Sequence, residues 1–489
     1  MNGTECHSVS MEKAVHGVWA ALGADAALLE RITRGPDAPG ALTARLPVMG
    51  LARATVAACA LAAAELSATR ADRAARARGV AGGAQRARVP RVRVDDGAVA
   101  TAFHSERYVQ ADGRAAATFA PLSRFWRTSD GWVRTHANYP HHRERLLTAL
   151  GLPSGAGADA VAAELGRRRA LDVEEEVYGA GGLAVAVRSG TEWAAHPQGA
   201  LVAGQPLLTL ERTGGAPGPG PVLDLPGPGA QPCAGVRVLD MTRVLAGPIA
   251  TRTLALLGAD VLRVDSPRLP ESQDVHNDTG MGKRSTLLDL ARSVDREAFE
   301  DLLARADVVV TGYRPGALDR FGLSAEALAA RRPGLVVAEL SAWGRSGPWG
   351  GRRGFDSLVQ AASGIALHEG SPLRPGALPA QALDHGTGYL LAAAVLRALT
   401  ERHLDGGTWL VRAALARTAH WLRHELEEAP PTTTGGEPYA PDPWRAERAG
   451  PLGRLRYARS PGVYEGGPKD WARPAGRWGT DLACWAAGR

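Results

Sequence analysis

The second half of the chain, from residue 233 onward, alternates short apolar segments with segments of helical pattern. The apolar segments have the length of strands and cover residues 236–240, 260–264, 307–310 and 334–340. The helical patterns cover residues 247–258, 296–306 and 325–331. Strands joined by single helices pair in parallel, and ligands bind such sheets at the carboxyl ends of the strands. The pattern predicts an α/β fold, a Rossmann-like parallel sheet with helices on both faces. It also predicts a site in the loops after Asp240, Val264, Val310 and Leu340.

The first half of the chain has a different pattern. Helices and strands are expected over residues 42–75, 89–94, 125–135, 140–150 and 158–168. The segment 125–135 is expected to form a hairpin that turns at Asp130-Gly131. This order is typical of a smaller α+β domain. The Gly/Pro-rich stretch 214–232 has neither strand nor helix periodicity, so it is expected to separate the two halves.

A faint internal repeat relates the two halves. Residues 46–58 resemble residues 378–390 at a constant offset of 332 residues, and both segments lead into Ala/Leu-rich helices. Asp384 stands just before the helix in the second copy, and Ala52 occupies the matching position in the first. Ala-rich helices also resemble one another by chance. If the repeat is real, the chain holds one copy of a site with its carboxylate and one copy without it.

Composition limits the classes of function. The 489-residue sequence has no uninterrupted apolar run long enough to span a membrane, and its first ten residues lack a signal-peptide pattern. Its four cysteines are scattered, without metal-binding or disulfide spacing. The net charge of +6 comes from arginines spread along the chain, without an aromatic–basic motif. We therefore expect a soluble cytoplasmic enzyme with no metal site, no nucleic-acid partner and no membrane contact.

Two common nucleotide-binding motifs are absent from the sequence. Leu245-Ala-Gly-Pro248 follows the first predicted strand, where a dinucleotide-binding fold carries Gly-x-Gly-x-x-Gly. Gly280-Met-Gly-Lys-Arg-Ser285 lacks the glycine spacing of a phosphate-binding P-loop. NAD and ATP chemistry therefore have no support in the sequence.

Six ordered segments of the second half resemble family III CoA-transferases, which include formyl-CoA transferase, carnitine CoA-transferases and α-methylacyl-CoA racemase. They are residues 235–248, 257–265, 282–285, 313–322, 354–364 and 378–390. The first half resembles the small domain of the same family and the segment that closes it. The matching residues are 126–131, 140–153 and 185–206. The chain thus resembles two partial copies in nearly permuted order.

Five segments are expected from this resemblance. They are a degenerate partial copy of the large domain at 1–110, a small α+β domain at 111–213, a Gly/Pro linker at 214–232, a Rossmann-like CoA-binding catalytic domain at 233–426, and an irregular tail at 427–489 that packs on the small or the large domain. Members of the family form interlocked dimers. The two halves are therefore expected to pack as an internal pseudo-dimer, and a further homodimer of the whole chain stays open.

The resemblance implies CoA transfer through Asp384. In the family this carboxylate attacks an acyl-CoA thioester, and an aspartyl-CoA thioester then passes CoA to a carboxylic acid. The N-terminus of the following helix would favour the ionised carboxylate, and amides of a turn at Gly386-Thr387-Gly388 would stabilise oxyanions. The alternative is that Asp384 only caps the helix. CoA enters as part of the substrate, and no permanently bound cofactor is expected.

Six further residues match positions that bind CoA in the family. Lys283 is expected to contact phosphate, Arg320 the nucleotide end, and Tyr313 the adenine or pantetheine path. The loop after the first strand contributes Val244, Leu245 and Ala246. Each has a plain alternative, because the two cations would otherwise lie on the surface and Tyr313 would otherwise pack in the core.

Departures from the family pattern leave the substrates open. Ser266 replaces an Arg that some members place after the second strand. Ser341 and Trp343 replace a Lys/Tyr pair of formyl-CoA transferase. The acyl-CoA donor and the acceptor acid are therefore not specified, and transfer within one diacid stays open.

Two alternatives to CoA transfer remain. The racemase branch pairs the aspartate with a histidine as second acid/base, but Phe355 occupies that position here and cannot transfer a proton. His385 adjoins Asp384, yet neighbouring residues rarely face one reacting centre from opposite sides. The other alternative is a non-catalytic CoA-binding protein, which the intact Asp384 argues against.

Overall fold

The computed structural model describes residues 13–77, 87–117, 119–214, 231–427 and 439–486. Its largest sheet has seven strands in the order β11-β10-β9-β12-β13-β14-β8. They are β9 (Arg237–Met241), β10 (Asp260–Asp265), β11 (Arg284–Leu287), β12 (Val308–Thr311), β13 (Val336–Ser341), β14 (Thr408–Ala414) and β8 (Thr209–Gly214). All neighbours are parallel except β8, which runs antiparallel to β14. The order reverses between β9 and β12, where ligands bind in doubly wound sheets.

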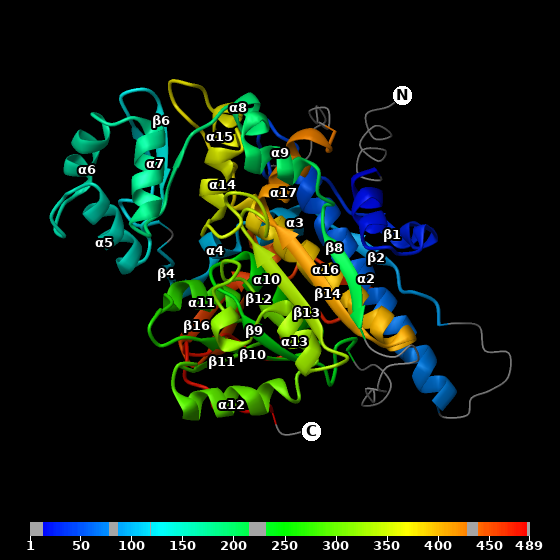
Figure 1. The fold of residues 1–489 in the computed structure, drawn as a ribbon. Helices are drawn as coiled ribbons and strands as arrows, with labels where there is room; N and C mark the ends of the chain where they lie inside the picture. The colour runs from blue at the N-terminus through cyan, green and yellow to red at the C-terminus, as the bar shows by residue number, and fades with distance from the viewer. Residues whose placement is uncertain (1–12, 78–86, 118, 215–230, 428–438, 487–489) are drawn as a thin grey trace, which may run out of the picture.

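Helices cover both faces of this sheet, as Figure 1 shows. One face packs on α10 (Ala246–Leu256) and α16 (Ala382–Asp405), and the other on α12 (Ser293–Leu303) and α13 (Ala325–Arg331). Val308 and Val310 join the first core, whereas Val309 between them joins the second. Because both faces are buried, the strand reads as a continuous apolar run. The predicted α/β fold class is confirmed.

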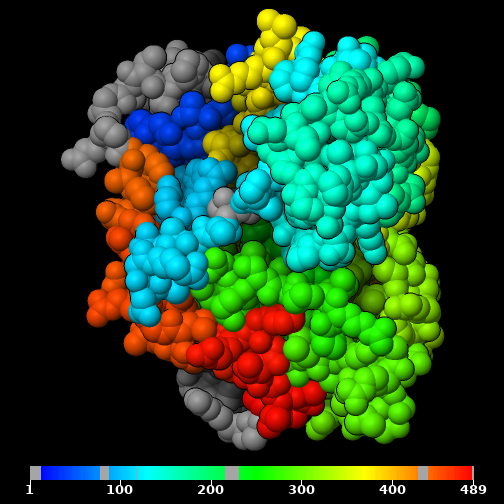
Figure 2. Space-filling view, turned by 90° about the vertical axis from the view of Figure 1, so that its left-hand side faces the viewer, coloured from blue at the N-terminus to red at the C-terminus, as the bar shows by residue number. Residues whose placement is uncertain are grey.

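The first half of the chain contains a small domain with its own hydrophobic core. Its sheet consists of β5 (Phe125–Arg127), β6 (Trp132–Thr135) and β7 (Ala184–Ala186), and its helices are α5 (Pro140–Ala149), α6 (Ala158–Leu165) and α7 (Ala170–Gly179). The indole N–H of Trp126 donates to Thr135 Oγ1 at 2.8 Å across the hairpin. Figure 2 shows this domain lying over the second half of the chain.

The first half also completes the large sheet. After the small domain, α8 (Gly190–Ala195) and α9 (Pro197–Ala203) lead into β8, which forms the antiparallel edge beside β14. Residues 215–230, which contain most of the predicted linker, lie outside the described residues. The two halves therefore share one sheet.

The two helices of the predicted internal repeat pack against each other. The long helix α2 (Val48–Ala77) lies along α16, and this is the most extensive contact between any two elements in the described residues. The close approach requires a glycine, because a Cβ at Gly386 would lie 2.6 Å from Leu51 Cδ2. Residues 48–76 are long and apolar enough to cross a membrane, but most of the apolar stretch is buried inside the protein. Here α2 is a core helix.

The tail pairs with strands from the start of the chain. β15 (Arg445–Gly450) and β16 (Gly453–Ala458) form a hairpin, and β16 pairs with β3 (Gln110–Ala111), which pairs with β4 (Arg114–Ala115). β17 (Val463–Tyr464) joins β2 (Val92–Val94), which pairs with β1 (Ile32–Arg34). The prediction of an irregular tail is thus wrong over these strands, because β16 and β17 pair with β3 and β2 more than 300 residues away, and such pairing leaves no local signal.

The remaining described helices are short, apart from α17. They are η1 (Ala26–Arg31), α3 (Asp96–Ala102), α4 (Ser105–Tyr108), α11 (Gln273–Thr279), η2 (Asp319–Phe321), α14 (Asp356–Ala362), α15 (Ile365–Glu369), α17 (Leu415–His424) and η3 (Asp442–Trp444). Among them, α4 and α14 bring side chains to the site described next.

Candidate active site

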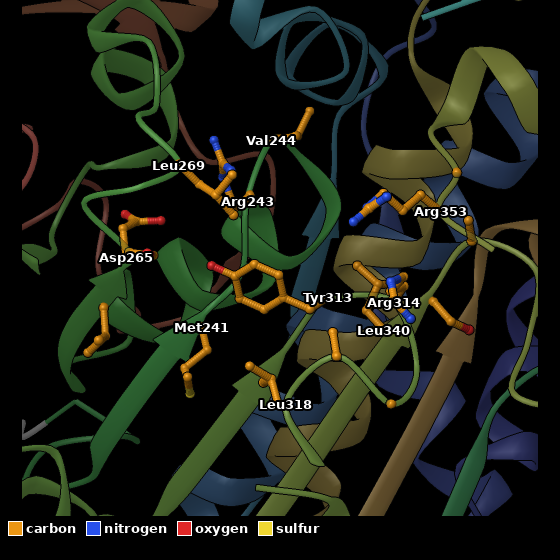
Figure 3. Close-up of a pocket in the computed structure, with 18 of the residues that line it drawn as sticks. Met241, Arg243, Val244, Asp265, Leu269, Tyr313, Arg314, Leu318, Leu340 and Arg353 are labelled. Atoms are coloured by element: carbon orange, nitrogen blue, oxygen red, sulfur yellow. The ribbon is translucent and has the colours of Figure 1, made fainter. Parts of the chain in front are cut away.

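A cavity of about 560 Å³ opens at the carboxyl ends of the parallel strands. The loops singled out in the sequence all contribute to its wall. They do so through Arg243 after β9, Ser266 after β10, Tyr313 after β12 and Ser341 at the end of β13. Figure 3 shows the Tyr313 ring in the middle of this cavity. Of the predicted site residues, Val244, Ala246, Tyr313, Arg320 and Asp384 line it, and Leu245 and Lys283 do not.

Asp384 lies in the first turn of α16 and faces the cavity. Its side chain is buried, yet no described residue donates a hydrogen bond to its carboxylate. The helix is capped instead by Asp356, the first residue of α14. Asp356 Oδ2 accepts the backbone N–H of Leu383 at 2.9 Å and that of Asp384 at 3.0 Å. The capping role that was the alternative for Asp384 therefore belongs to Asp356.

The surroundings of Asp384 oppose its ionisation. Burial, followed by the negative charges of Asp356 and Glu106, raises the pKa of Asp384 well above its ordinary value. Burial also raises the pKa of Asp356 to about 6, although the amides of Asp384 and Leu383 and the side chain of Gln360 oppose this rise. The expectation that the helix N-terminus keeps Asp384 ionised is therefore not met, because the amides nearest to it are bonded to Asp356.

Glu106 reaches this region from α4 in the first half. His385 Nε2 lies 3.0 Å from Glu106 Oε2, and the buried imidazole stacks on Phe103 with ring centroids 5.1 Å apart. Burial raises the pKa of Glu106, but the hydrogen bond and charge of His385 outweigh it and leave the pKa below its ordinary value. A carboxylate from one half thus acts electrostatically on Asp384 of the other.

Gly386 and Gly388 lie inside α16 rather than in a turn. A Cβ at Gly388 would lie 2.6 Å from the carbonyl oxygen of Ala246 in α10, and one at Gly386 would meet Leu51 in α2. The glycines therefore allow α16 to pack closely between two helices. The expected oxyanion-binding turn is wrong, because tertiary packing overrides the local preference of glycine for turns.

Lys283 is buried in the core, away from the cavity. Its ammonium group donates to Asp240 Oδ2 at 2.9 Å, to the carbonyl oxygen of Pro248 at 2.8 Å and to Thr251 Oγ1 at 2.6 Å. These three acceptors use all three donors of an ammonium group. Burial lowers the pKa of Lys283 to about 8. Lys283 thus has neither the expected phosphate contact nor a position on the surface. It joins β9 to α10 instead.

The loop after β9 is strained where it meets the cavity. Val244 has a φ of 69°, in the left-handed region that a β-branched residue rarely adopts. Its N–H donates to Glu271 Oε2 at 3.4 Å, and Tyr139 of the small domain donates to Glu271 Oε1 at 2.8 Å. Leu245, next to it, is buried in the apolar core. Glu271 therefore fixes the loop and ties both halves together at the cavity.

Several arginines of the cavity wall lack an acidic partner. Arg320 stacks on Phe321 with its guanidinium carbon 4.6 Å from the ring centre. Within the described residues, no carboxylate lies within 4.0 Å of the charged groups of Arg314, Arg320 or Arg353. Arg314 and Arg353 were not predicted from the sequence, although Arg314 lies within a segment of the family resemblance and Arg353 adjoins another. An anionic ligand would find these cations unpaired.

The small domain also contributes to the cavity wall. His136 stacks face to face on Phe355, with ring centroids 3.7 Å apart and planes 2° apart. Tyr139 and His142 line the cavity from the same domain. Sequence reasoning missed these residues, because their place at the cavity depends on contacts between segments more than 200 residues apart. The cavity is therefore built by both halves.

Comparison with known proteins finds similarity over the segment that contains Asp384. Residues 233–443 match the model of CoA-transferase family III. The chain is 34% identical over 208 residues to a probable fatty acyl-CoA transferase of Mycobacterium tuberculosis, across 40% of this chain and 53% of that protein. It is 32% identical over 214 residues to the succinyl-CoA–L-malate CoA-transferase beta subunit of Chloroflexus aurantiacus, across 40% of this chain and 52% of that protein.

The similarity covers only part of these relatives. A crystal structure of a hypothetical protein from Mycobacterium tuberculosis is 35% identical, with a TM-score of 0.38, across 40% of this chain and 57% of that chain. The chain spans about a third to a half of the length of the curated relatives it matches. The matched segment lies in the second half, so the partial copy expected in the first half stays a prediction.

Proposed function

We propose that this protein is a CoA-transferase that moves CoA from an acyl-CoA thioester to a carboxylic acid, with Asp384 as the nucleophile. The observation that carries the proposal is the state of Asp384. Its carboxylate faces the cavity in the family segment and receives no hydrogen bond from a described residue, while Asp356 satisfies the adjoining amides. A carboxylate that only capped a helix would make those bonds itself.

The proposed reaction proceeds by acyl transfers through Asp384. The carboxylate oxygen attacks the thioester carbonyl carbon and the C–S bond breaks. CoA departs as a thiolate, and a mixed anhydride between Asp384 and the acyl group remains. The thiolate attacks Asp384 Cγ, the bond from Cγ to the bridging oxygen breaks, and the donor acid departs as a carboxylate. The acceptor carboxylate then attacks Asp384 Cγ and releases CoA thiolate, which gives a second mixed anhydride. The thiolate attacks the acyl carbon of the acceptor in this anhydride, which gives the new acyl-CoA and frees the Asp384 carboxylate. The raised pKa of Asp384 means that its carboxylate, once ionised, is a more basic nucleophile than an ordinary aspartate.

CoA would lie across the carboxyl ends of the strands. Val244, Ala246 and Tyr313 would contact its pantetheine or adenine, and Arg320 would pair with phosphate. Lys283 leaves this proposed set, because its donors are already used. Its proposed role is to hold β9 against α10.

Both halves would form one working site. The first half supplies Tyr139, His142 and Glu106, and the second supplies Asp384. This arrangement supports the internal pseudo-dimer that was expected from the sequence. A cytoplasmic location and any further oligomer stay predictions.

Trapping the covalent intermediate tests the proposal. The full chain is incubated with a panel of acyl-CoAs, treated with hydroxylamine and mapped by mass spectrometry. We expect a hydroxamate on Asp384 in the wild type, and in Asp405→Asn, which alters an exposed aspartate at the other end of α16. Asp384→Asn should give none. A label on another residue, or none with any acyl-CoA, contradicts the proposal.

A further inference from the structure

The loop after β9 meets the cavity in a backbone conformation that its sequence does not favour. Val244 has a φ of 69°, a left-handed conformation in which a β-branched side chain crowds the backbone. Arg243 and Val244 both line the cavity, and Figure 3 shows them close together above the Tyr313 ring. Strain of this kind persists only where the surroundings enforce it, and it is common where a backbone meets a ligand. The contacts that enforce it are therefore candidates for a functional role.

Glu271 supplies these contacts from the loop after β10. Its Oε2 accepts the N–H of Val244 at 3.4 Å and lies 3.5 Å from Arg243 Nε. Arg263 of β10 donates to the same oxygen at 3.2 Å. Burial raises the pKa of Glu271, but the charges of Arg243 and Arg263 outweigh it and leave the pKa below its ordinary value. Glu271 is therefore an ionised acceptor that holds both the backbone and a side chain of the loop.

The small domain completes this arrangement through Tyr139. Its hydroxyl donates to Glu271 Oε1 at 2.8 Å, and the guanidinium carbon of Arg243 lies 4.8 Å from the centre of its ring. Burial, followed by the charge of Glu271, raises the pKa of Tyr139 well above its ordinary value, so the hydroxyl stays a donor. One hydroxyl of the first half thus fixes the carboxylate that holds the strained loop of the second half.

Another tyrosine of the small domain also reaches the second half but holds no strained residue. Tyr178 of α7 donates its hydroxyl to the carbonyl oxygen of Arg353 at 2.9 Å, and Arg353 does not have a positive φ. Among the described residues, the other non-glycine residues with a positive φ are Leu42 and Asp112, and neither lines the cavity. In the described part of the chain, backbone strain and the cavity therefore coincide only at Val244.

We propose that Tyr139 and Glu271 are positioning residues that keep the loop after β9 in its strained conformation, and that CoA binds tightly only to this conformation. The inference rests on the proposed CoA-transferase function and adds a control of the CoA site by the first half of the chain. Neither residue has to touch CoA, because the hydrogen bond between them acts on the backbone of Val244. Without the Tyr139 hydroxyl the loop relaxes in part of the molecules, and the apparent affinity for CoA falls with the fraction that stays competent.

Calorimetry with CoA tests the inference on the full chain, because it measures binding without turnover. Tyr139→Phe removes the hydroxyl and keeps the ring. We expect its Kd for CoA to be about 10-fold higher than that of the wild type, because a hydrogen bond to a charged group is lost. Tyr178→Phe, which also removes a tyrosine hydroxyl between the two halves, is the matched control and should leave this Kd unchanged. Circular dichroism checks the fold of both variants.

A glycine in place of Val244 separates the strain of the loop from every other role of Tyr139. Glycine adopts a positive φ without crowding, so the loop no longer depends on being held. In a Val244→Gly background, Tyr139→Phe should raise Kd no more than about 2- to 3-fold relative to Val244→Gly alone. A tyrosine that contacts CoA directly, or that only stabilises the small domain, would cause the same loss in both backgrounds.

Three results would overturn the inference. One is a Tyr139→Phe protein that binds CoA as tightly as the wild type. Another is an equal rise in Kd from Tyr139→Phe in the wild-type and Val244→Gly backgrounds. The third is a wild type that does not bind CoA, which would overturn the proposed function as well.

The hydroxamate at Asp384 reports on the transferase separately. If the wild type forms it and Tyr139→Phe leaves Kd unchanged, the positioning role is refuted and the transferase stands. If the expected pattern of Kd values appears without any hydroxamate, the transferase is refuted and the positioning role stands.

Discussion

The starts of α16 and α2 occupy matching positions in the internal repeat but differ in what surrounds them. At α16, Asp384 faces a cavity of about 560 Å³ and its amide is held by Asp356. At α2, Ala52 is fully buried, and two spaces along that helix measure only about 10 and 20 Å³. A space of this size holds about one water molecule. Both helices are packed in the core, whereas among the described residues the large cavity opens only at the start of α16.

The charges near the two helices differ in the same way. Beside Ala52, Arg53 Nε donates to Asp96 Oδ1 at 2.6 Å, so the buried carboxylate has a cation. Asp384 has two carboxylates as its neighbours and no cation bonded to it among the described residues. A buried charge with a partner costs less free energy than one without a partner. A buried carboxylate without a cation has a perturbed pKa, which is typical of functional sites. This difference is the one that the proposed function requires, with α2 serving structure and α16 serving reaction.

Removing the carboxylate of Asp384 should have the largest effect. Asp384→Asn keeps the shape but cannot form an anhydride, so we expect CoA transfer to fall by at least about 1,000-fold. Steady-state assays with the full chain check this loss, and circular dichroism checks the fold. Near wild-type activity would mean that α16 is no more a reactive helix than α2.

Adding a carboxylate at the other helix should not create a second site. Ala52→Asp places an acid where no cavity receives it, and we expect a loss of about 3 kcal/mol of unfolding free energy. Urea denaturation measures the loss, with Ala52→Ser as a milder control. A stable Ala52→Asp protein that forms a hydroxamate at residue 52 would show that the first copy retains a site.

Changing the neighbours of Asp384 should shift its titration. Glu106→Gln and Asp356→Asn each remove a negative charge that raises the pKa of Asp384, and an Asn oxygen at 356 can still accept the two amides. The ionised nucleophile should then persist to lower pH. We expect the acid limb of the kcat/KM profile to move to lower pH in both variants, and further in Asp356→Asn. Movement to higher pH would contradict this electrostatic account.

The contact between α2 and α16 can be tested at Gly386. Gly386→Ala would bring a Cβ to 2.6 Å from Leu51 Cδ2, so we expect a loss of about 2 kcal/mol of stability. In a Leu51→Ala background the same substitution should cost less, because the clash is gone. A double-mutant cycle in urea measures this coupling. Additive effects would mean that the two helices do not constrain each other here.

Local patterns predicted much of the fold and less of the site. The valines of β12 and the helix 325–331 were found from the sequence because burial and periodicity are visible within a few residues. The pairing of β8 with β14 was not found, because its partners are about 200 residues apart. Lys283 fits a family motif, yet its partner Asp240 lies 43 residues away and draws it into the core. His142 and Arg353 meet only through tertiary packing.

The smallest expected effect is a pH-dependent gain in stability from Asp384→Asn. The folded protein holds the proton of Asp384 more tightly than the unfolded chain, because the pKa is raised above its usual value of 3.8. As pH rises above that value, the unfolded chain ionises first and stability is lost until the folded group also titrates. An asparagine loses nothing over this window.

Thermal melting at pH 5 and pH 8 should therefore show a Tm advantage of Asp384→Asn over the wild type that is larger at pH 8. Asp405→Asn, at the exposed end of α16, is the control for general charge removal. An advantage that is absent at pH 8 would mean that the buried carboxyl carries no electrostatic cost. In that case α16 would differ from α2 only in the cavity at its start, and not in the electrostatic cost of ionising Asp384 in its first turn.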